Sequence, residues 1–255
     1  MILGFPDAEA VALFAASEFV RRARKATWDR GVFRVALAGG STPQLTYELL
    51  AGSKFAPQVD WASVQVYFGD ERAVAPDHHD SNFNMAHNAL LGSVPLHSSQ
   101  IHRMAGEHGD LHEAALEYAE VLASTFGTTP AQGFPRFDLV LLGMGKDGHT
   151  ASLFPHTEAL DEQRAWVVHN EVPQLHTNRL TLTAPLINAA RAVIFLVAGD
   201  DKAQPLERVL EGERNPSEFP SQLIQPEGEL LWLVDEAASE LLTTKPRPPG
   251  TYDPS

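Results

Sequence analysis

The sequence predicts an α/β fold of three layers, in which a mostly parallel, Rossmann-like sheet lies between helices. Short apolar runs, typical of strands buried in a parallel sheet, alternate along the chain with longer segments whose apolar residues recur at helical spacing. Several of the apolar runs end directly at glycine-rich turns. The chain has 255 residues, 44% of them hydrophobic, which is enough for one large α/β domain or two small ones.

The expected helices have recognisable ends. Asp7 can cap the first helix, and Gly31 follows it as a stop signal. Thr42 and Pro43 suit the N-cap and first position of the second helix, and Ser81 suits the N-cap of the third. The helices are expected over residues 7–30, 43–50, 81–91, 110–126 and 204–210.

The apolar runs between these helices predict the strands. They are expected over residues 32–38, 64–68, 137–142, 166–169, 179–183, 192–198 and 230–234. No break rich in proline, glycine and serine divides the middle of the chain, so we expect a single domain over residues 1–242. Residues 243–255 are rich in proline and are expected to form a poorly ordered tail.

The composition excludes several classes of protein. The chain has no cysteine, which excludes disulfide scaffolds, thiolate metal sites and cysteine nucleophiles. It has no basic segment before an apolar N-terminal run and no stretch long enough to span a bilayer, so we expect a cytoplasmic protein with no membrane partner. A net charge of −14 argues against nucleic acid as a partner. The eleven histidines show no HExxH-type spacing, so we expect no metal and no cofactor.

Four of the predicted strands end in loops that carry polar and charged residues. If these strands are parallel, their carboxyl ends lie along one edge of the sheet and their loops face one cleft. In chain order, the loops read Gly-Gly-Ser-Thr-Pro after 32–38, Gly-Asp-Glu-Arg after 64–68, Gly-Met-Gly-Lys-Asp-Gly-His after 137–142 and Gly-Asp-Asp-Lys after 192–198.

The first loop has the means to hold a phosphate. Gly39 and Gly40 let the backbone approach a ligand closely, Ser41 and Thr42 offer hydroxyl groups, and the following helix presents free amides and the positive end of its dipole. The loop is neither a Walker sequence nor a GxGxxG fingerprint, and taken alone it is better explained as an ordinary capped strand-to-helix turn.

Three cations lie where they can complete an anion site. Arg72 and Lys202 follow strand ends, and Arg179 begins a strand. Arginine grips phosphate in a bidentate manner, whereas lysine acts as a mobile point charge. The alternative is that these side chains form surface ion pairs. Asp70 and its neighbour Glu71 can orient Arg72 or cap the chain after the strand.

The third loop places Asp147 two residues before His149 on a backbone freed by glycines. A carboxylate beside an imidazole is a plausible acid/base pair, because the imidazole titrates close to neutral pH. The alternative is a glycine-rich turn whose polar residues are merely solvated.

Six blocks, taken together, resemble the 6-phosphogluconolactonase family. They are GGSTP, FGDER, SNFNMA, GMGKDGHTASLFP, RLTLTAPLINAA and VAGDDK, and they occur in order between Val35 and about Leu210. The resemblance implies hydrolysis of 6-phosphoglucono-1,5-lactone to 6-phosphogluconate, the second step of the oxidative pentose phosphate pathway. It also implies a Rossmann-like fold that is shared with glucosamine-6-phosphate deaminase and binds a sugar phosphate rather than a nucleotide.

The resemblance also implies roles for single residues. His149 matches the base that deprotonates water, and Asp147 matches the group that orients it. Asp70 matches an acidic residue that supports the arginine or binds a hydroxyl group. The positions around the phosphate and sugar are Gly40, Ser41, Thr42, Arg72, Arg179 and Lys202. We expect a small sugar-phosphate substrate and a monomer, with a dimer as the alternative.

Two other functions compete with this one. The deaminase relatives carry a glutamate five residues after the histidine, a position that Phe154 occupies here. A sugar-phosphate sensor without activity would need the phosphate loop but neither Asp147 nor His149, and both are present. The sequence does not identify the group that stabilises charge on the carbonyl oxygen.

Overall fold

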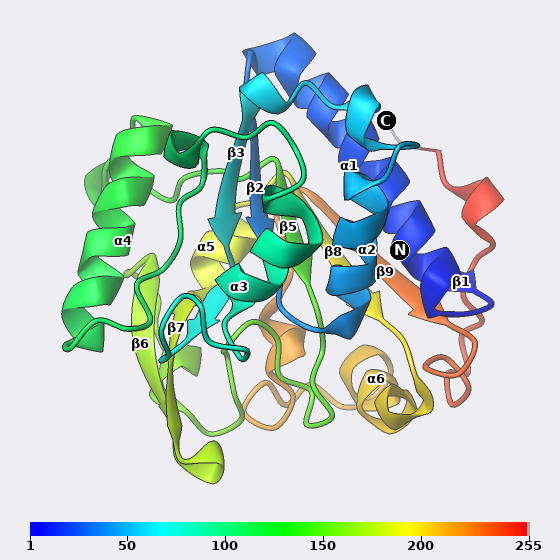
Figure 1. Ribbon diagram of the computed structural model, residues 1–255. Coiled ribbons are helices and arrows are strands. Elements are labelled where there is room, and N and C mark those ends of the chain that lie inside the picture. The colour runs from blue at the N-terminus through cyan, green and yellow to red at the C-terminus, as the bar shows by residue number, and fades with distance from the viewer. Residues whose placement is uncertain (254–255) are drawn as a thin grey trace.

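The computed structural model describes residues 1–253 and is built on a six-stranded sheet. All neighbouring strands in this sheet are parallel, and helices cover both of its faces (Figure 1). The predicted fold class is therefore confirmed. In sheet order the strands are β1 (Ile2–Phe5), β9 (Glu229–Asp235), β8 (Ala192–Val197), β5 (Leu139–Leu142), β2 (Phe33–Leu37) and β3 (Val64–Phe68).

Alternation along the strands produces two apolar cores, one on each face of the sheet. In β8, Ile194 and Leu196 belong to one core, whereas Val193 and Phe195 belong to the other. The first core is covered by α1 (Ala8–Arg30) and α2 (Ser41–Ala51). The second is covered by α4 (Leu111–Phe126), the short α5 (Ala184–Asn188) and α6 (Ala203–Leu210).

A second sheet of three antiparallel strands lies against α4. It consists of β4 (Asp70–Arg72), β7 (Thr177–Leu182) and β6 (Val167–Val172). The sequence predicted strands close to β6 and β7 but did not predict β4, because three polar residues do not form an apolar run. This small sheet carries Arg72 and Arg179 on adjacent strands.

The helix ends agree with the predicted caps at three of four positions. Asp7 accepts a hydrogen bond from the amide of Ala10, Gly31 ends α1 in the left-handed region, and Ser81 caps α3 (Asn82–Ala86). A π-helical turn over His87–Leu91 then continues α3. The predicted N-cap Thr42 is wrong: Gly40 caps α2, because its positive φ of 103° turns the chain and its carbonyl accepts from the amide of Gln44.

The proline-rich tail is less free than its composition predicts. Arg247 exchanges two backbone hydrogen bonds with β1, to Ile2 (2.9 Å) and from Gly4 (2.9 Å), and the ring of Tyr252 packs against Phe14. The unpaired backbone groups of an edge strand account for this docking. The sequence predicted neither β1 nor its pairing with the tail, whose last residues, 254–255, lie outside the described part. Within residues 1–253, no helix has both the length and the apolar character of a membrane span.

Candidate active site

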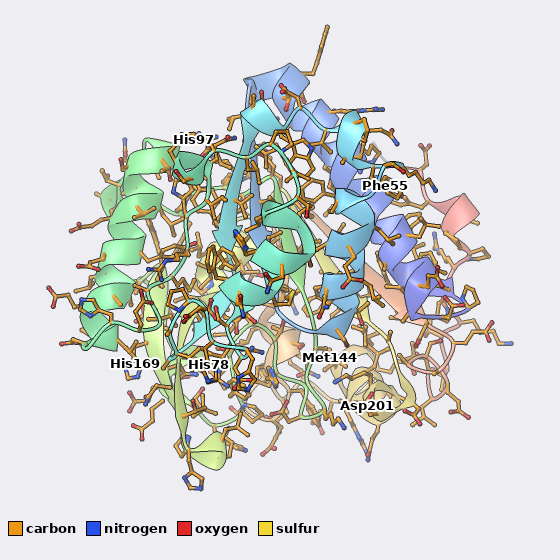
Figure 2. All side chains as sticks on the ribbon, viewed as in Figure 1. Phe55, His78, His97, Met144, His169 and Asp201 are labelled. Atoms are coloured by element: carbon orange, nitrogen blue, oxygen red, sulfur yellow. The ribbon has the colours of Figure 1, made fainter. Side chains whose placement is uncertain are left out.

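A cavity of about 350 Å³ opens at the carboxyl edge of the parallel sheet. The loops after β2, β5 and β8 meet there, together with β4 and β7 of the small sheet. Figure 2 shows Met144 and Asp201, from the loops after β5 and β8, toward this edge, far from Phe55 and His97 at the opposite edge. The predicted residues that line the cavity are Gly39, Gly40, Ser41, Thr42, Asp70, Arg72, His149, Arg179 and Lys202.

The loop after β2 presents the start of α2 to this cavity. Tyr47 holds the end of β2, since its hydroxyl donates to the carbonyl of Ala38 (2.8 Å) and accepts from the amide of the same residue (2.9 Å). Because α2 starts at Ser41, its first amides have no partners within the helix. Free amides and the helix dipole at a cavity wall favour an anionic group.

Gly39 lies directly against the side chain of Asn82. A Cβ atom at position 39 would lie 2.0 Å from Asn82 Oδ1, so only glycine fits without displacing the amide. Asn82 Nδ2 donates to the carbonyl of Asp70 (2.9 Å), whereas Asn82 Oδ1 is buried and has no hydrogen-bond partner within residues 1–253. Asn82 lines the cavity and was not among the predicted site residues. Its place in the SNFNMA block, one of the six that carry the family resemblance, was the available signal.

Arg72 and Arg179 face the cavity from neighbouring strands and are paired in register. Arg72 donates to the carbonyl of Asp80, and Arg179 Nη1 donates to Thr177 Oγ1 (2.8 Å). Burial lowers the pKa of Arg179, and the positive charge of Arg72 lowers it further. Neither guanidinium forms an ion pair with a carboxylate among residues 1–253. The carboxylates of Asp70, Asp80 and Glu71 raise the pKa of Arg179 from beyond ion-pair distance. Two neighbouring cations without a direct carboxylate partner favour an anionic ligand between them.

Glu71 holds the segment behind Arg72. Its buried carboxylate accepts hydrogen bonds from the backbone amides of Arg72 (2.9 Å), Asn82 (2.7 Å) and Phe83 (2.8 Å), and from the hydroxyl of Ser81 (3.0 Å). Of the two roles suggested by the sequence, capping the chain after the strand is therefore the one that the contacts show. Four donors on one carboxylate fix the start of α3 against β4.

Asp70 connects three segments beneath the cavity. It is 7% exposed, its Oδ2 accepts from Ser152 Oγ (2.7 Å), and its Oδ1 accepts from Asn82 Nδ2 (3.2 Å). Because both carboxylate oxygens have protein partners, the geometry favours a positioning role for Asp70 over direct binding of a hydroxyl group.

His149 and Asp147 form a close pair at the cavity wall. His149 Nδ1 lies 2.5 Å from Asp147 Oδ1, and the imidazole stacks on the ring of Phe154 with centroids 4.0 Å apart. Partial burial raises the pKa of Asp147, but the hydrogen bond and the charge of His149 outweigh it, and the net pKa lies below its ordinary value. Asp147 is not part of the cavity wall; it reaches the site through His149.

The backbone of this loop leaves room for the imidazole. A Cβ atom on Gly145 would lie 2.1 Å from His149 Nδ1 and 2.6 Å from Asp147 Oδ1. The amide of Gly145 donates to the carbonyl of His149 (2.8 Å), which closes the loop. Gly148 turns the chain at a φ of 76°. Glycine is therefore required at position 145 to leave room for the imidazole and is favoured at position 148 by its positive φ.

Lys202 completes the set of cations. Its side chain is 20% exposed, and its Nζ lies 3.5 Å from Asp201 Oδ2. The same carboxylate oxygen lies 3.3 Å from Lys146 Nζ, so one carboxylate is shared between two lysines. His149 and Lys202 lie on one cavity, as the convergence of the strand ends predicted.

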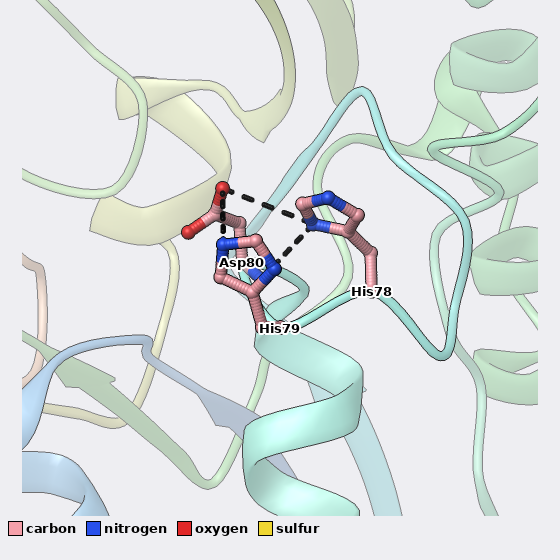
Figure 3. A group of neighbouring side chains, drawn as sticks. All are labelled: His78, His79 and Asp80. Carbon is pink, nitrogen blue, oxygen red and sulfur yellow. Dashed lines mark hydrogen bonds and ion pairs between the residues drawn. The ribbon is translucent and has the colours of Figure 1, made fainter.

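His78, His79 and Asp80 form an exposed group next to Arg72 (Figure 3). Asp80 Oδ2 lies 3.8 Å from His78 Nδ1 and 3.5 Å from His79 Nε2. Within residues 1–253 it is the one group of three side chains whose ligand atoms are close enough to share a metal ion. The three residues are consecutive on a loop, and nothing in their arrangement tests the absence of a metal requirement, which stays a prediction.

Comparison with known proteins identifies the family. The family model described as glucosamine-6-phosphate isomerases/6-phosphogluconolactonase matches residues 6–232. The chain belongs to this family. The resemblance noted in the sequence is therefore confirmed.

Individual relatives match over most of their lengths. A 6-phosphogluconolactonase from Synechocystis is 46% identical over 222 residues, which cover 87% of this chain and 89% of the relative. A 6-phosphogluconolactonase from Nostoc is 41% identical over 239 residues, covering 93% and 96%. The solved 6-phosphogluconolactonase from Trypanosoma cruzi superposes with a TM-score of 0.84 at 28% identity, covering 95% of this chain and 97% of that one.

A monomeric glucosamine-6-phosphate deaminase has the same fold. It superposes with a TM-score of 0.78 at 20% identity and covers 94% of this chain and 99% of its own. At this identity the likeness concerns the fold alone, so the choice between the two activities depends on the site.

Proposed function

We propose that this protein is an enzyme that hydrolyses 6-phospho-D-glucono-1,5-lactone to 6-phospho-D-gluconate. One observation carries the proposal: His149, bonded to Asp147, opens onto the same cavity as Arg72 and Arg179, which lack counterions among residues 1–253. A base and an anion site in one cavity suit a phosphorylated, hydrolysable substrate. The names of the relatives with 46% and 41% identity support the same activity.

In this proposal the phosphate binds between the two sheets. Arg72 and Arg179 reach it from the small sheet, and Lys202 reaches it from the loop after β8. The start of α2, over 39–42, supplies backbone amides and hydroxyl groups from the opposite wall. Phosphate binding fixes the sugar ring, so that the lactone carbonyl lies near His149.

The hydrolysis needs one base that can return its proton. Hydrogen bonding of Nδ1–H to Asp147 leaves Nε2 of His149 free to accept a proton from water. The resulting hydroxide attacks the lactone carbonyl, and a tetrahedral intermediate forms. The C–O bond to the ring oxygen then breaks, and the imidazolium gives its proton to that oxygen, which becomes a hydroxyl group. Asp147 stabilises the imidazolium between these two transfers.

Phe154 argues against the deaminase activity. The resemblance places the ring-opening glutamate of the deaminases at this position, and here the phenyl ring packs on His149 and lines the cavity. A phenyl ring has no proton to exchange with a substrate. The lactonase is therefore the better candidate of the two.

Turnover of the lactone distinguishes an enzyme from a sensor. We expect the purified protein to accelerate the disappearance of lactone that is freshly generated from glucose 6-phosphate, well above spontaneous opening. Binding of 6-phosphogluconate without any acceleration would indicate a sensor and refute the proposal.

We also propose that the protein is a cytoplasmic monomer that needs no cofactor.

Gly145→Ala should reduce turnover without unfolding the protein. The new methyl group would collide with both members of the pair and displace the imidazole from the substrate. A misplacement of about 1 Å can cost roughly 10²-fold in rate, so a fall in kcat of about 10- to 10²-fold is expected. Gly109→Ala is the matched control, because a Cβ there meets nothing within 4 Å. Equal kcat values for the two variants would contradict the proposed position of His149.

Asp147→Asn tests how the carboxylate acts. Loss of the negative charge destabilises the imidazolium, so kcat should fall by about 10- to 10²-fold, with KM changed less than about threefold. The acidic limb of the pH–rate profile should move to lower pH. Because the pKa of Asp147 lies below its ordinary value, the carboxylate is charged at neutral pH and the advantage of the wild type should be fully present there. That advantage should shrink as pH falls through the acidic limb of the wild-type profile, where His149 becomes protonated. A parallel rise in KM with an unmoved profile would indicate a structural role alone.

A further inference from the structure

A second cavity lies at the opposite end of the sheet from the candidate active site. Its volume is about 360 Å³, and its walls come from the last turns of α1 and from the residues at the amino ends of β5, β8 and β9. In Figure 1, α1 ends at the top, whereas the strand arrows point to the lower edge where the first cavity opens. The lining residues are Arg21, Arg22, Lys25, Ala26, Arg30, Arg136, Asp138, Arg191, Gly228 and Glu229.

The walls of this cavity are strongly cationic. Six of the nineteen lysines and arginines in the chain line it, although the net charge of the chain is −14. Two carboxylates, those of Asp138 and Glu229, belong to the same walls, and those of Glu18, Asp29 and Glu227 lie within 4 Å of wall cations. A local excess of positive charge inside an acidic protein attracts anions against the background field.

One side of the cavity has two arginines on a single carboxylate. Asp138 Oδ1 lies 2.8 Å from Arg30 Nη2 and 3.4 Å from Arg191 Nε, while its Oδ2 accepts from the amide of Arg34 (2.9 Å). Burial lowers the pKa of Arg191, and the positive charges of Arg30 and Arg136 lower it further, with Asp138 opposing them. At Arg191, the repulsion from Arg30 and Arg136 therefore exceeds the attraction to Asp138. Arg30 has a second carboxylate partner, since its Nη1 lies 3.6 Å from Asp29 Oδ2.

The other side has closer ion pairs, since Arg22 Nη2 lies 2.5 Å from Glu229 Oε2. Glu18 is shared between Arg21 (2.8 Å) and Arg22, whose Nε lies 3.3 Å away, buried and without a hydrogen bond. Lys25 and Arg136 reach their nearest carboxylates only at 3.8 Å and 3.9 Å, beyond hydrogen-bond distance. Several donors on these walls are thus available to a ligand.

We propose that this second cavity binds a compact anion with adjacent phosphate groups, such as a diphosphate. Five guanidinium groups offer the forked donors that match phosphate oxygens. The volume suits a small molecule. The only apolar side chain on the walls is that of Ala26, so no apolar pocket is present for a large apolar group. The site is remote from His149 and does not depend on the proposed lactonase activity.

The test is a titration of the full-length protein with inorganic pyrophosphate, followed through backbone amide chemical shifts. We expect the amides of Ala26 and Gly228, on the walls, to shift and saturate. Arg191→Gln combined with Arg136→Gln should weaken this binding by about tenfold or more, since each arginine contributes charge-assisted hydrogen bonds. Arg103→Gln, which removes an exposed ion pair with Glu107, should leave it unchanged. Unfolding of the double variant would show in its amide spectrum, and Lys25→Gln, on an exposed side chain, then replaces it.

Two further titrations distinguish binding at this site from binding in the first cavity and test the size of the ligand. Pyrophosphate can also bind in the first cavity, so the titration is repeated on the Arg72→Ala variant. In this variant the chemical-shift changes of the Ala26 and Gly228 amides should persist. Shifts confined to residues 39–42, or equal affinities for the wild type and the double variant, would overturn the proposal. ADP should bind no more than about threefold tighter than pyrophosphate, since the walls hold no apolar pocket for the base. A preference for ADP above tenfold would overturn the proposal of a compact ligand.

Discussion

His149→Ala is expected to lose most of the lactonase activity and to retain the binding of the sugar phosphate. The variant removes the only imidazole on the cavity wall but leaves Arg72, Arg179 and the start of α2 in place. General base catalysis typically contributes about 10²–10⁴-fold, so kcat should fall by that factor. The measurement is the initial rate on freshly generated lactone, corrected for spontaneous opening.

Binding supplies the second half of this experiment. The affinity for 6-phosphogluconate, measured by calorimetry, should change by less than about threefold, because the imidazole contributes little to holding the phosphate. His112→Ala is a suitable control, since His112 is exposed in the first turn of α4, far along the chain from the site. Unchanged turnover in His149→Ala, or a loss of affinity as large as the loss of rate, would refute the role of His149 as the base.

Arg72→Ala is expected to act on the phosphate and to spare the rest of the substrate. Arg72 has no carboxylate partner within residues 1–253, so its charge is available to the ligand, and its side chain donates only to the carbonyl of Asp80. A hydrogen bond to a charged group contributes about 1.5–3 kcal/mol, which corresponds to roughly a 10- to 10²-fold rise in KM for the phosphorylated lactone.

The unphosphorylated lactone distinguishes a phosphate contact from general damage to the site. kcat/KM for glucono-1,5-lactone should change by less than about threefold, since that substrate never used the guanidinium. Arg103→Ala, which removes a half-buried arginine paired with Glu107, should affect neither substrate. Equal losses for the phosphorylated and unphosphorylated lactones would mean that Arg72 supports the fold of the site and does not bind phosphate.

Apolar patterning and caps explain why so much of the fold could be predicted. The run 64–68 coincides with β3, and the run 192–198 differs from β8 by one residue, because fully buried parallel strands need continuous apolar side chains. β1 and β4 were not predicted, because neither is a long continuous apolar run. β1 is apolar but has only four residues, one of them glycine, and β4 consists of three polar residues. Their pairing with β9 and β7 is decided by distant parts of the chain.

The candidate site could be predicted as a set of loops but not as a set of contacts. Chain order placed glycines, Arg72, His149 and Lys202 after strands, and parallel strands bring such loops to one edge. The unpartnered oxygen of Asn82 and the stacking of Phe154 on His149 depend on how the loops pack against one another. Spacing along the chain carries no information on that packing.

By itself, the sequence determined the three-layer fold, the family and the loops that carry the chemistry, because burial and backbone freedom leave local patterns in the residues. Only the tertiary structure decided which charges lack partners. Arg72 and Arg179 are crowded because β4 pairs with β7, and the second cavity joins cations of α1 to Arg136 and Arg191 from far along the chain. An electrostatic field sums over neighbours in space, whatever their separation in sequence.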